Sequence, residues 1–255
     1  MGFIKTKIEE HVLHIILDRG KSNAMDINLV EELITEFSNA EDNPSIEGVI
    51  LTGKESFFSS GLDLIELYNY DEQQMKNFWQ RFMFLAQKLS GFPKPFVTAI
   101  TGHSPAGGCV LALCADYRIM AEGEFIIGLN EVPVGLVVPE SIFDLYSFWL
   151  GEAVAYRSLL EGKLFNPSEA LQVGLVDEVV PFNKIQQTAI RKLKSFSQFN
   201  RSAWGSSKTN FKKKLVAKLN HEQDQVIDQV LKQWWNPQTR AIMKTIIDNL
   251  TAKKN

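Results

Sequence analysis

The stretch SPAGGCVLALCADYRIM, residues 104–120, decides how the fold is interpreted. Its apolar residues predict a buried helix, yet Gly107 and Gly108 stand in the first turn, where each glycine weakens an ordinary helix by about 1 kcal/mol. The stretch follows a strand pattern and a turn, so these glycines lie where a helix has unpaired backbone N–H groups. With Ala106, they leave those groups open to a ligand's carbonyl oxygen. Close packing against another helix would demand the same small residues, so both interpretations stay open here.

A second stretch, LTGKESFFSSGLDL at residues 51–64, has the same character. It follows a strand pattern and places Gly61 before Leu62 and Asp63. Two loops that each leave the carboxyl end of a strand and present backbone N–H groups can converge on one oxygen, which is the geometry of an oxyanion hole. The sequence alone does not show that they converge. Asp63 is expected to cap the helix that follows it, with a ligand contact as the alternative.

Strand and helix patterns alternate along most of the chain, which indicates an α/β protein. The strand patterns lie at residues 4–18, 47–53, 96–100 and 174–180, and the helical patterns at 27–43 and 72–89. Short strands and loops follow Gly123, and from Pro139 the pattern is mostly helical. From Asn200 onward the chain is helical and charged. We therefore expect an α/β core at 1–199 and a helical subdomain at 200–255.

The composition is that of a globular chain with a sizeable core, since 45% of the 255 residues are apolar. The chain has 27 basic and 30 acidic residues, and the resulting net charge of −3 provides no general attraction to nucleic acid or to an anionic membrane. No apolar run is long enough to span a bilayer, and the sequence has neither metal-ligand spacing nor a nucleotide-binding fingerprint. We expect no nucleic-acid, membrane or metal partner.

The cysteines and the N-terminal residues suggest a compartment. Cys109 and Cys114 lie five residues apart within one apolar pattern, where they cannot face each other, and the sequence has no other cysteine. We expect two buried free thiols in a reducing compartment. The first residues pass directly into a strand pattern without the sections of a signal peptide, which predicts a cytoplasmic location.

Both glycine-containing stretches resemble a known family. FFSSGLDL, residues 57–64, and HSPAGGCVLALCADYRIM, residues 103–120, resemble the two signature loops of the crotonase family, also called the enoyl-CoA hydratase/isomerase superfamily. The resemblance extends from SNAMD at 22–26 to PSEALQVGLVDEVVP at 167–181 and weakens in the final helices. Within the family, IGLNEVPVGLVVP at 127–139 is most similar to the mitochondrial-type Δ3,Δ2-enoyl-CoA isomerases.

The resemblance implies a fold, a substrate and a site. The fold would be a spiral of ββα units with a C-terminal helical region that builds trimers or hexamers. The substrate would be an acyl-CoA thioester, with no cofactor beyond the coenzyme A that the substrate carries. The backbone N–H groups of Leu62 and Gly107 would form the oxyanion hole. The substrate contacts implied by the matching positions are Lys21, Ala24, Ser60, Gly61, Asp63, Ala106, Gly108, Val110, Asn130 and Leu136.

The family resemblance also separates two chemistries. Hydratases of the family carry two glutamates, and here Val110 stands at the first position while Glu131 fills the second. An aliphatic side chain neither holds a water molecule nor transfers a proton, so water addition lacks one of its groups. One carboxylate is enough for a double-bond shift: Glu131 would take a proton from C2 of a 3-enoyl-CoA and return it at C4. Leu136 and other apolar neighbours would raise its basicity.

Several alternatives stay open. Glu131 by itself reads as a surface or capping carboxylate, and Asn130 would either orient it or cap the turn. The reaction would instead be hydration or thioester hydrolysis if another residue such as Glu140 supplied the missing acid, or the chain would bind acyl-CoA without catalysis. The C-terminal lysines are expected to form a solvated helix face, part of which would meet the phosphates of coenzyme A; they are Lys208, Lys212, Lys213, Lys214 and Lys218. Trp234 and Trp235 cannot share one side of a helix, so a second subunit or a second contact within the chain would cover one of them.

Overall fold

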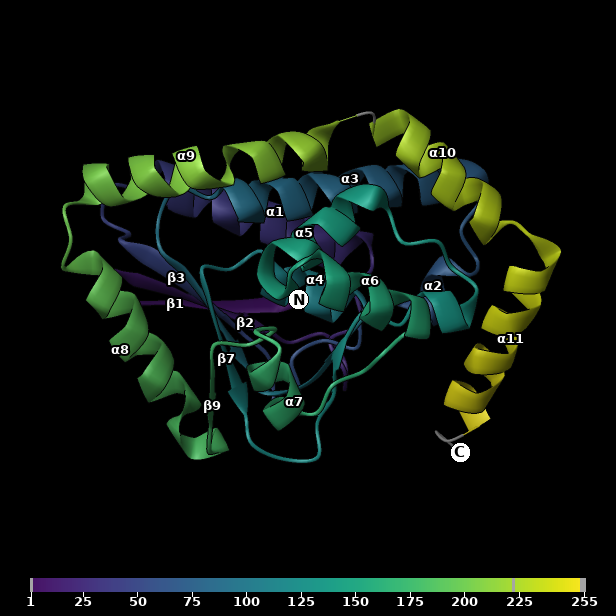
Figure 1. The fold of residues 1–255 in the computed structure, drawn as a ribbon, viewed down its shortest axis with the longest axis horizontal. Helices are drawn as coiled ribbons and strands as arrows, with labels where there is room; N and C mark the ends of the chain where they lie inside the picture. Colours follow the sequence, from purple (N-terminus) through teal and green to yellow (C-terminus); the bar gives the residue numbers. More distant parts are fainter. Residues whose placement is uncertain (1, 222, 253–255) are drawn as a thin grey trace.

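The computed structural model describes residues 2–221 and 223–252, and its centre is a six-stranded sheet (Figure 1). The strands stand in the order β1-β2-β3-β5-β7-β9, with a hairpin between β1 and β2 and parallel pairs elsewhere. Their bounds are Ile4–Glu9 for β1, Val12–Leu17 for β2, Gly48–Thr52 for β3, Phe96–Ile100 for β5, Tyr117–Ala121 for β7 and Glu178–Val180 for β9.

A second sheet has three short parallel strands, β4 (Ser56–Phe57), β6 (Gly102–Pro105) and β8 (Ile127–Gly128), with β6 in the middle. Each of them follows one strand of the large sheet, and a helix comes next, so the chain repeats a strand–strand–helix unit three times. This is the repeat that the predicted spiral of ββα units requires. Because the three short strands run in parallel, the segments that leave them emerge at one edge of the small sheet.

Helices cover both faces of the large sheet. Ile185, Ala189 and Leu193 of α8 pack on one face, and a larger core on the other face includes the buried sides of α1, α3, α4 and α5. In Figure 1, α9 runs beside α3 along the top, and α11 stands at the opposite end from α8. The helices are α1 (Ile27–Asp42), α2 (Leu64–Leu67), α3 (Glu72–Gly91), α4 (Gly107–Leu113), α5 (Glu140–Leu150), α6 (Glu152–Glu161), α7 (Pro167–Gln172), α8 (Ile185–Ser197), α9 (Arg201–Asn220), α10 (Gln223–Trp234) and α11 (Pro237–Ala252).

The single helix predicted for residues 104–120 is wrong. The stretch begins in β6, contains α4 over Gly107–Leu113 only, and ends in β7 at Tyr117–Ala121. Four of the five β7 residues are buried, and a parallel strand covered on both faces has a continuous apolar sequence that periodicity does not separate from a buried helix. The helical part ends at Leu113. Between it and β7, the Asp116 side chain accepts a hydrogen bond from the Phe96 N–H at 2.9 Å.

The lysine-rich face of α9 is also not wholly solvated. Lys213, Lys214 and Lys218 are exposed, but Lys208 and Lys212 are buried. Both ammonium groups point to Asp116, with Nζ–O distances of 2.6 and 3.3 Å. The prediction failed because a lysine at helical spacing gives no sign of a buried carboxylate elsewhere in the chain.

The two adjacent tryptophans and the two cysteines are all at least partly buried within the chain. Trp234 is fully buried, and the Trp235 ring lies 5.0 Å from the Arg240 guanidinium, so the second contact is within the chain. Cys109 and Cys114 are buried free thiols, as predicted. Among the described residues, no helix combines the length and the apolar character that a membrane crossing requires.

Candidate active site

Two loops, one after β4 and one after β6, converge through direct backbone contact. The Phe58 and Ser59 N–H groups donate to the His103 carbonyl at 3.0 and 3.3 Å, which ties the loops together at their base. A Cβ atom at Gly108 would lie 2.4 Å from the Ser59 carbonyl oxygen, and one at Gly61 would lie 3.1 Å from the Gly107 nitrogen. Only glycines permit this approach, so the convergence that the sequence left open is present.

The converged loops carry unused backbone donors. The N–H groups of Leu62 and Gly107 have no hydrogen-bond acceptor within residues 2–221 and 223–252. Gly61, next to Leu62, has a φ of 87°, and Ala106, next to Gly107, has a φ of 49°, a region that residues with a side chain rarely adopt. Strained backbone of this kind clusters at functional sites. Two free donors on adjoining loops can hold one ligand oxygen.

The segment that contains Ala24 and Met25 lies against both loops. The Met25 N–H donates to the Gly61 carbonyl at 2.8 Å, and the Asp63 N–H donates to the Met25 carbonyl at 2.9 Å, forming a parallel bridge with Leu62. The Met25 side chain also reaches the other loop, since a Cβ at Gly107 would lie 2.5 Å from its Cε atom. The segment therefore contacts the backbone on both sides of the unused donors.

Glu131 comes from the third short strand. β8 pairs with β6, with Gly128 opposite Pro105, and Glu131 follows β8 at the start of a short 3₁₀ helix, Val132–Val134. Its backbone carbonyl accepts from the Val134 and Leu136 N–H groups at 3.1 and 3.0 Å. The residue is half-buried, and its Oε2 atom is buried without a hydrogen-bond partner among the described residues. Burial raises the pKa of this carboxyl to about 7.

The surroundings of Glu131 are apolar. Val110 and Leu136 are buried, with 2% and 8% of their surfaces exposed. The thiol of Cys109 on α4 and the hydroxyl of Tyr146 on α5 have raised pKa values, mainly through burial and partly through the charge of Glu131. Because the charge of Glu131 contributes to both pKa shifts, Glu131 lies near Cys109 of α4 and Tyr146 of α5. An unpaired carboxylate in such surroundings is a strong base for its type.

Tyr146 was not predicted from the sequence. Its side chain is fully buried, and its hydroxyl has no hydrogen-bond partner within the described residues. In the sequence it is one apolar position of a helical pattern, and no motif distinguishes it from a core tyrosine. Only the fold brings it near Glu131.

The remaining predicted contacts lie around the two loops with different surroundings. Lys21 is exposed, whereas Ala24, Ser60 and Ala106 are half-buried. The Asn130 side chain forms no hydrogen bond in the described part of the chain, so neither of its two expected roles is visible.

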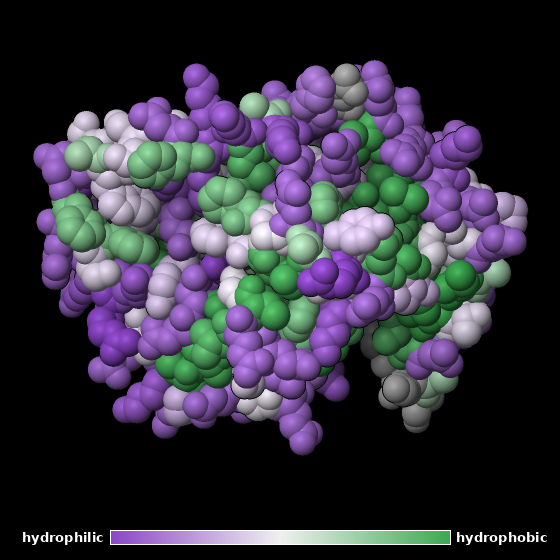
Figure 2. Space-filling view, in the orientation of Figure 1, coloured by the Kyte–Doolittle hydropathy of each residue, from purple (hydrophilic) through white to green (hydrophobic). Residues whose placement is uncertain are grey.

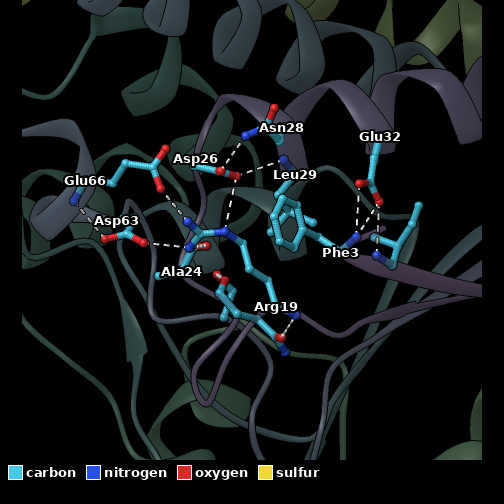
Figure 3. A network of polar contacts seen from close by, with 12 residues as sticks. Phe3, Arg19, Ala24, Asp26, Asn28, Leu29, Glu32, Asp63 and Glu66 are labelled. Carbon is cyan, nitrogen blue, oxygen red and sulfur yellow. Dashed lines mark hydrogen bonds and ion pairs between the residues drawn. The ribbon is translucent and has the colours of Figure 1, made fainter. Parts of the chain in front are cut away.

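Asp63 caps α2, as expected, because its side chain accepts from the Glu66 N–H at 3.1 Å. Its other carboxylate oxygen binds Arg19 at 2.6 Å (Figure 3).

A cavity lies elsewhere, at the start of α9. It has a volume of about 700 Å³ and lies between the start of α9 and the segments that precede β3 and β5, and Lys94, Phe196, Arg201 and Trp204 are among its lining residues. None of the predicted site residues lines it. Its two cations are engaged, since Lys94 donates to the Ala40 and Asn43 carbonyls and Arg201 pairs with Glu47. The converged loops and Glu131, not this cavity, contain the features of a reactive site.

Comparison with known proteins gives consistent relatives. Residues 7–246 match the family described as enoyl-CoA hydratase/isomerase. The mitochondrial enoyl-CoA delta isomerase 1 of Mus musculus is 41% identical over 169 residues, which are 66% of this chain and 58% of the mouse protein. The Homo sapiens protein of the same name is 35% identical over 204 residues, 79% of this chain and 68% of the human one. The chain therefore spans only about 58% of the length of the mouse relative.

A solved structure agrees over the whole chain. Human mitochondrial delta3-delta2-enoyl-CoA isomerase superposes with a TM-score of 0.96 at 29% sequence identity, covering 99% of this chain and 100% of that one. This likeness confirms the predicted fold, including the helical C-terminal region.

Proposed function

Since the chain belongs to the enoyl-CoA hydratase/isomerase family, we propose that it is an isomerase that moves the double bond of a 3-enoyl-CoA to the trans-2 position. The observation that carries the proposal is the state of Glu131. Its carboxyl has a buried, unpartnered oxygen and a pKa raised to about 7, so it exchanges a proton readily near neutral pH. The mouse and human relatives and the solved human structure named above are isomerases, which agrees with this choice.

In the proposed reaction, the thioester oxygen accepts hydrogen bonds from the Leu62 and Gly107 N–H groups. The Glu131 carboxylate takes a proton from C2, and the electron pair of that C–H bond forms the C1–C2 double bond of a dienolate whose charge rests on the held oxygen. Glu131 then gives the proton to C4, the C2–C3 double bond forms, and the carbonyl is restored. One carboxylate serves both steps because only C3 separates C2 from C4.

Hydration is less well supported because a second acid is missing. Val110 occupies the position of the first hydratase glutamate and is buried in apolar surroundings. Glu140, the alternative acid, is exposed in the first turn of α5. Thioester hydrolysis and acyl-CoA binding without turnover stay as the other outcomes of the test.

The test is product analysis with two substrates. Purified protein with 3-enoyl-CoA is expected to form the conjugated 2-enoyl thioester, detected by its ultraviolet absorbance and by mass. Glu131→Gln is expected to lose at least about a thousandfold in kcat, because the only proton carrier is gone. Glu140→Gln, which removes an exposed carboxylate, is the matched control and retains full activity. A 3-hydroxyacyl product from 2-enoyl-CoA would favour hydration, and no turnover of any acyl-CoA would contradict catalysis.

We also propose that the chain assembles as a homotrimer or as a hexamer. Large apolar side chains are exposed at Phe148, Tyr156 and Leu160 of α5 and α6 and at Phe211 of α9, which is 79% exposed. Figure 2 shows hydrophobic residues among polar ones on the face that α5 and α6 occupy. Light scattering is expected to give about three or six times the chain mass of 28.9 kDa; a monomer would contradict this proposal.

The predicted location and the predicted absence of a cofactor are proposals as well. We keep the cytoplasmic location and the absence of a cofactor beyond the coenzyme A of the substrate. The mouse and human relatives are named as mitochondrial proteins, so imaging of the tagged full chain would test the first. Activity of protein dialysed against a chelator, with 3-enoyl-CoA as the only addition, would test the second.

A further inference from the structure

Arg19 is the centre of a dense polar cluster beside the proposed oxyanion hole (Figure 3). It follows β2 and only 15% of its side chain is exposed. Nη1 donates to the Ala24 carbonyl at 2.7 Å and to Asp63 Oδ2 at 2.6 Å, and Nη2 donates to Glu66 Oε2 at 2.6 Å. Nε lies 3.3 Å from Asp26 Oδ1. Three carboxylates therefore surround a single guanidinium.

The partners of Arg19 stand on both sides of the Met25–Leu62 bridge. Ala24 precedes Met25 on one side, and Asp63 follows Leu62 on the other. A planar guanidinium fixes the relative placement of two acceptors more strictly than a single ammonium group. The clamp joins the Ala24 carbonyl to the Asp63 carboxylate, and Leu62 pairs with Met25 and directly precedes Asp63, so the direction of the Leu62 N–H depends on the clamp.

The same segment transmits the constraint to the other proposed donor. Met25, held between Ala24 and Asp26, packs against Gly107, and the Leu62 side chain does so as well, with a Cβ at Gly107 falling 3.3 Å from Leu62 Cδ2. If the segment around Met25 moved away, Gly107 would lose its contact with the Met25 side chain, and the distance between Gly107 and Leu62 would no longer be fixed. Removal of Arg19 would leave Asp26, Asp63 and Glu66 to repel one another around the site that the guanidinium occupied.

We propose that Arg19 is a positioning residue for the oxyanion hole, acting through Ala24 and Asp63 to aim the Leu62 N–H and to hold it at a fixed distance from the Gly107 N–H. The proposal rests on the function proposed above. It adds a residue that contacts neither the thioester nor Glu131, and it assigns to the Arg19 cluster a part in the chemical step.

The expected signature is a loss in kcat with little change in KM. The hole binds the dienolate oxygen more tightly than the neutral thioester, so misplaced donors weaken the transition state more than the ground state. Removal of one oxyanion donor typically costs about a hundred- to a thousandfold in kcat. A displaced donor retains part of its effect, and we expect Arg19→Met to lose about ten- to a hundredfold in kcat with KM within about threefold.

The experiment compares Arg19→Met with Arg81→Met. Arg81 also forms a two-armed ion pair, with Glu31, but it joins α3 to α1 away from the loops, so it controls for the loss of a clamp as such. Arg81→Met is expected to retain wild-type kcat and KM. Arg19→Lys keeps the charge without the fork and is expected to lose less kcat than Arg19→Met; it carries the test if Arg19→Met does not fold.

A binding measurement reports on the hole without turnover. Acetoacetyl-CoA has an acidic C2 proton, and its enolate absorbs in the near ultraviolet. Wild type and Arg81→Met are expected to develop the enolate band on binding this probe, and Arg19→Met to develop a weaker band at equal saturation. Loss of general stability would not lower the band at a temperature where each variant is folded by circular dichroism.

The outcomes separate this proposal from the function on which it rests. If Glu131→Gln abolishes isomerisation while folded Arg19→Met and Arg19→Lys keep wild-type kcat and enolate band, the positioning role is overturned and the isomerase stands. A rise in KM alone in the Arg19 variants, or an equal loss of kcat in Arg81→Met, also overturns it. If wild type turns over no 3-enoyl-CoA, the proposed function fails, whatever the Arg19 variants do with acetoacetyl-CoA.

Discussion

Replacing Glu131 by glutamine is expected to stabilise the protein at high pH and to leave it nearly unchanged at low pH. Burial raises the pKa of Glu131 from its ordinary 4.5 to about 7 in the folded chain. A carboxyl whose folded pKa is raised binds its proton more tightly in the folded state than in the unfolded one. Its contribution to stability is present below about pH 4.5 and is lost as the pH rises through about 7.

The magnitude follows from the size of the pKa difference. Each pKa unit corresponds to about 1.4 kcal/mol, so the difference between 4.5 and about 7 sets an upper limit of roughly 3.5 kcal/mol on the cost of ionising Glu131 in the folded protein. The residue is half-buried rather than enclosed, which reduces the cost through solvent screening. We expect Glu131→Gln to gain about 2 kcal/mol relative to wild type between pH 5 and pH 8.5, a rise of about 4 to 8 °C in relative melting temperature.

The assay is thermal unfolding of both proteins across this pH range at one protein concentration and one ionic strength. Glu140→Gln serves as the control, because Glu140 is exposed and its replacement is expected to give a constant difference from wild type. The reasoning would be refuted if the difference in melting temperature between wild type and Glu131→Gln stayed constant from pH 5 to pH 8.5. A constant difference would mean that the carboxyl is solvated or paired in solution, and the proposed proton carrier would lose its raised basicity.

Three further outcomes are expected. The kcat/KM for 3-enoyl-CoA should rise about tenfold per pH unit below an apparent pKa of about 7, because only ionised Glu131 accepts the C2 proton; a flat profile from pH 5 to 8 would contradict this. Gly108→Ala should lose about 2 kcal/mol of stability and most activity, since its Cβ would lie 2.4 Å from the Ser59 carbonyl oxygen, and unchanged denaturation would show that the loops can separate freely. Lys208→Met should lose about 2 kcal/mol in urea denaturation at pH 7, because Asp116 would keep only part of its buried pairing.

Long amphipathic helices were the most predictable part of the fold. The patterns at 27–43 and 72–89 match α1 and α3 to within two residues at each end, because each helix buries one face and has an aspartate at its N-cap. The hairpin within 4–18 was missed, since its turn at Glu10 and His11 contains no glycine, although both residues have positive φ values of 47° and 66°. Turn residues of this type give no local sequence signal.

Long-range features were beyond the reach of pattern alone. The two glycine-containing loops were identified as donor-bearing, but their contact depends on the pairing of β4 with β6, residues 46 apart in the Ser56–Gly102 pair. The partnership of Lys208 with Asp116 and the burial of Tyr146 near Glu131 depend in the same way on packing between distant segments. The family resemblance supplied what periodicity lacks, namely which loops meet.

The shape of α4 shows how the fold compensates for an open donor site. The helix has only seven residues, begins with two glycines and lacks a side-chain N-cap, so it would not persist alone. A capping side chain would occupy the donors that the proposed reaction needs. Support comes instead from complete burial of all seven residues and from the opposite end, where Lys212 donates to the Cys114 carbonyl at 3.2 Å. Helix α9 of the C-terminal region therefore stabilises α4 from the C-terminal end of α4, which leaves the backbone donors at the start of α4 available for the proposed reaction.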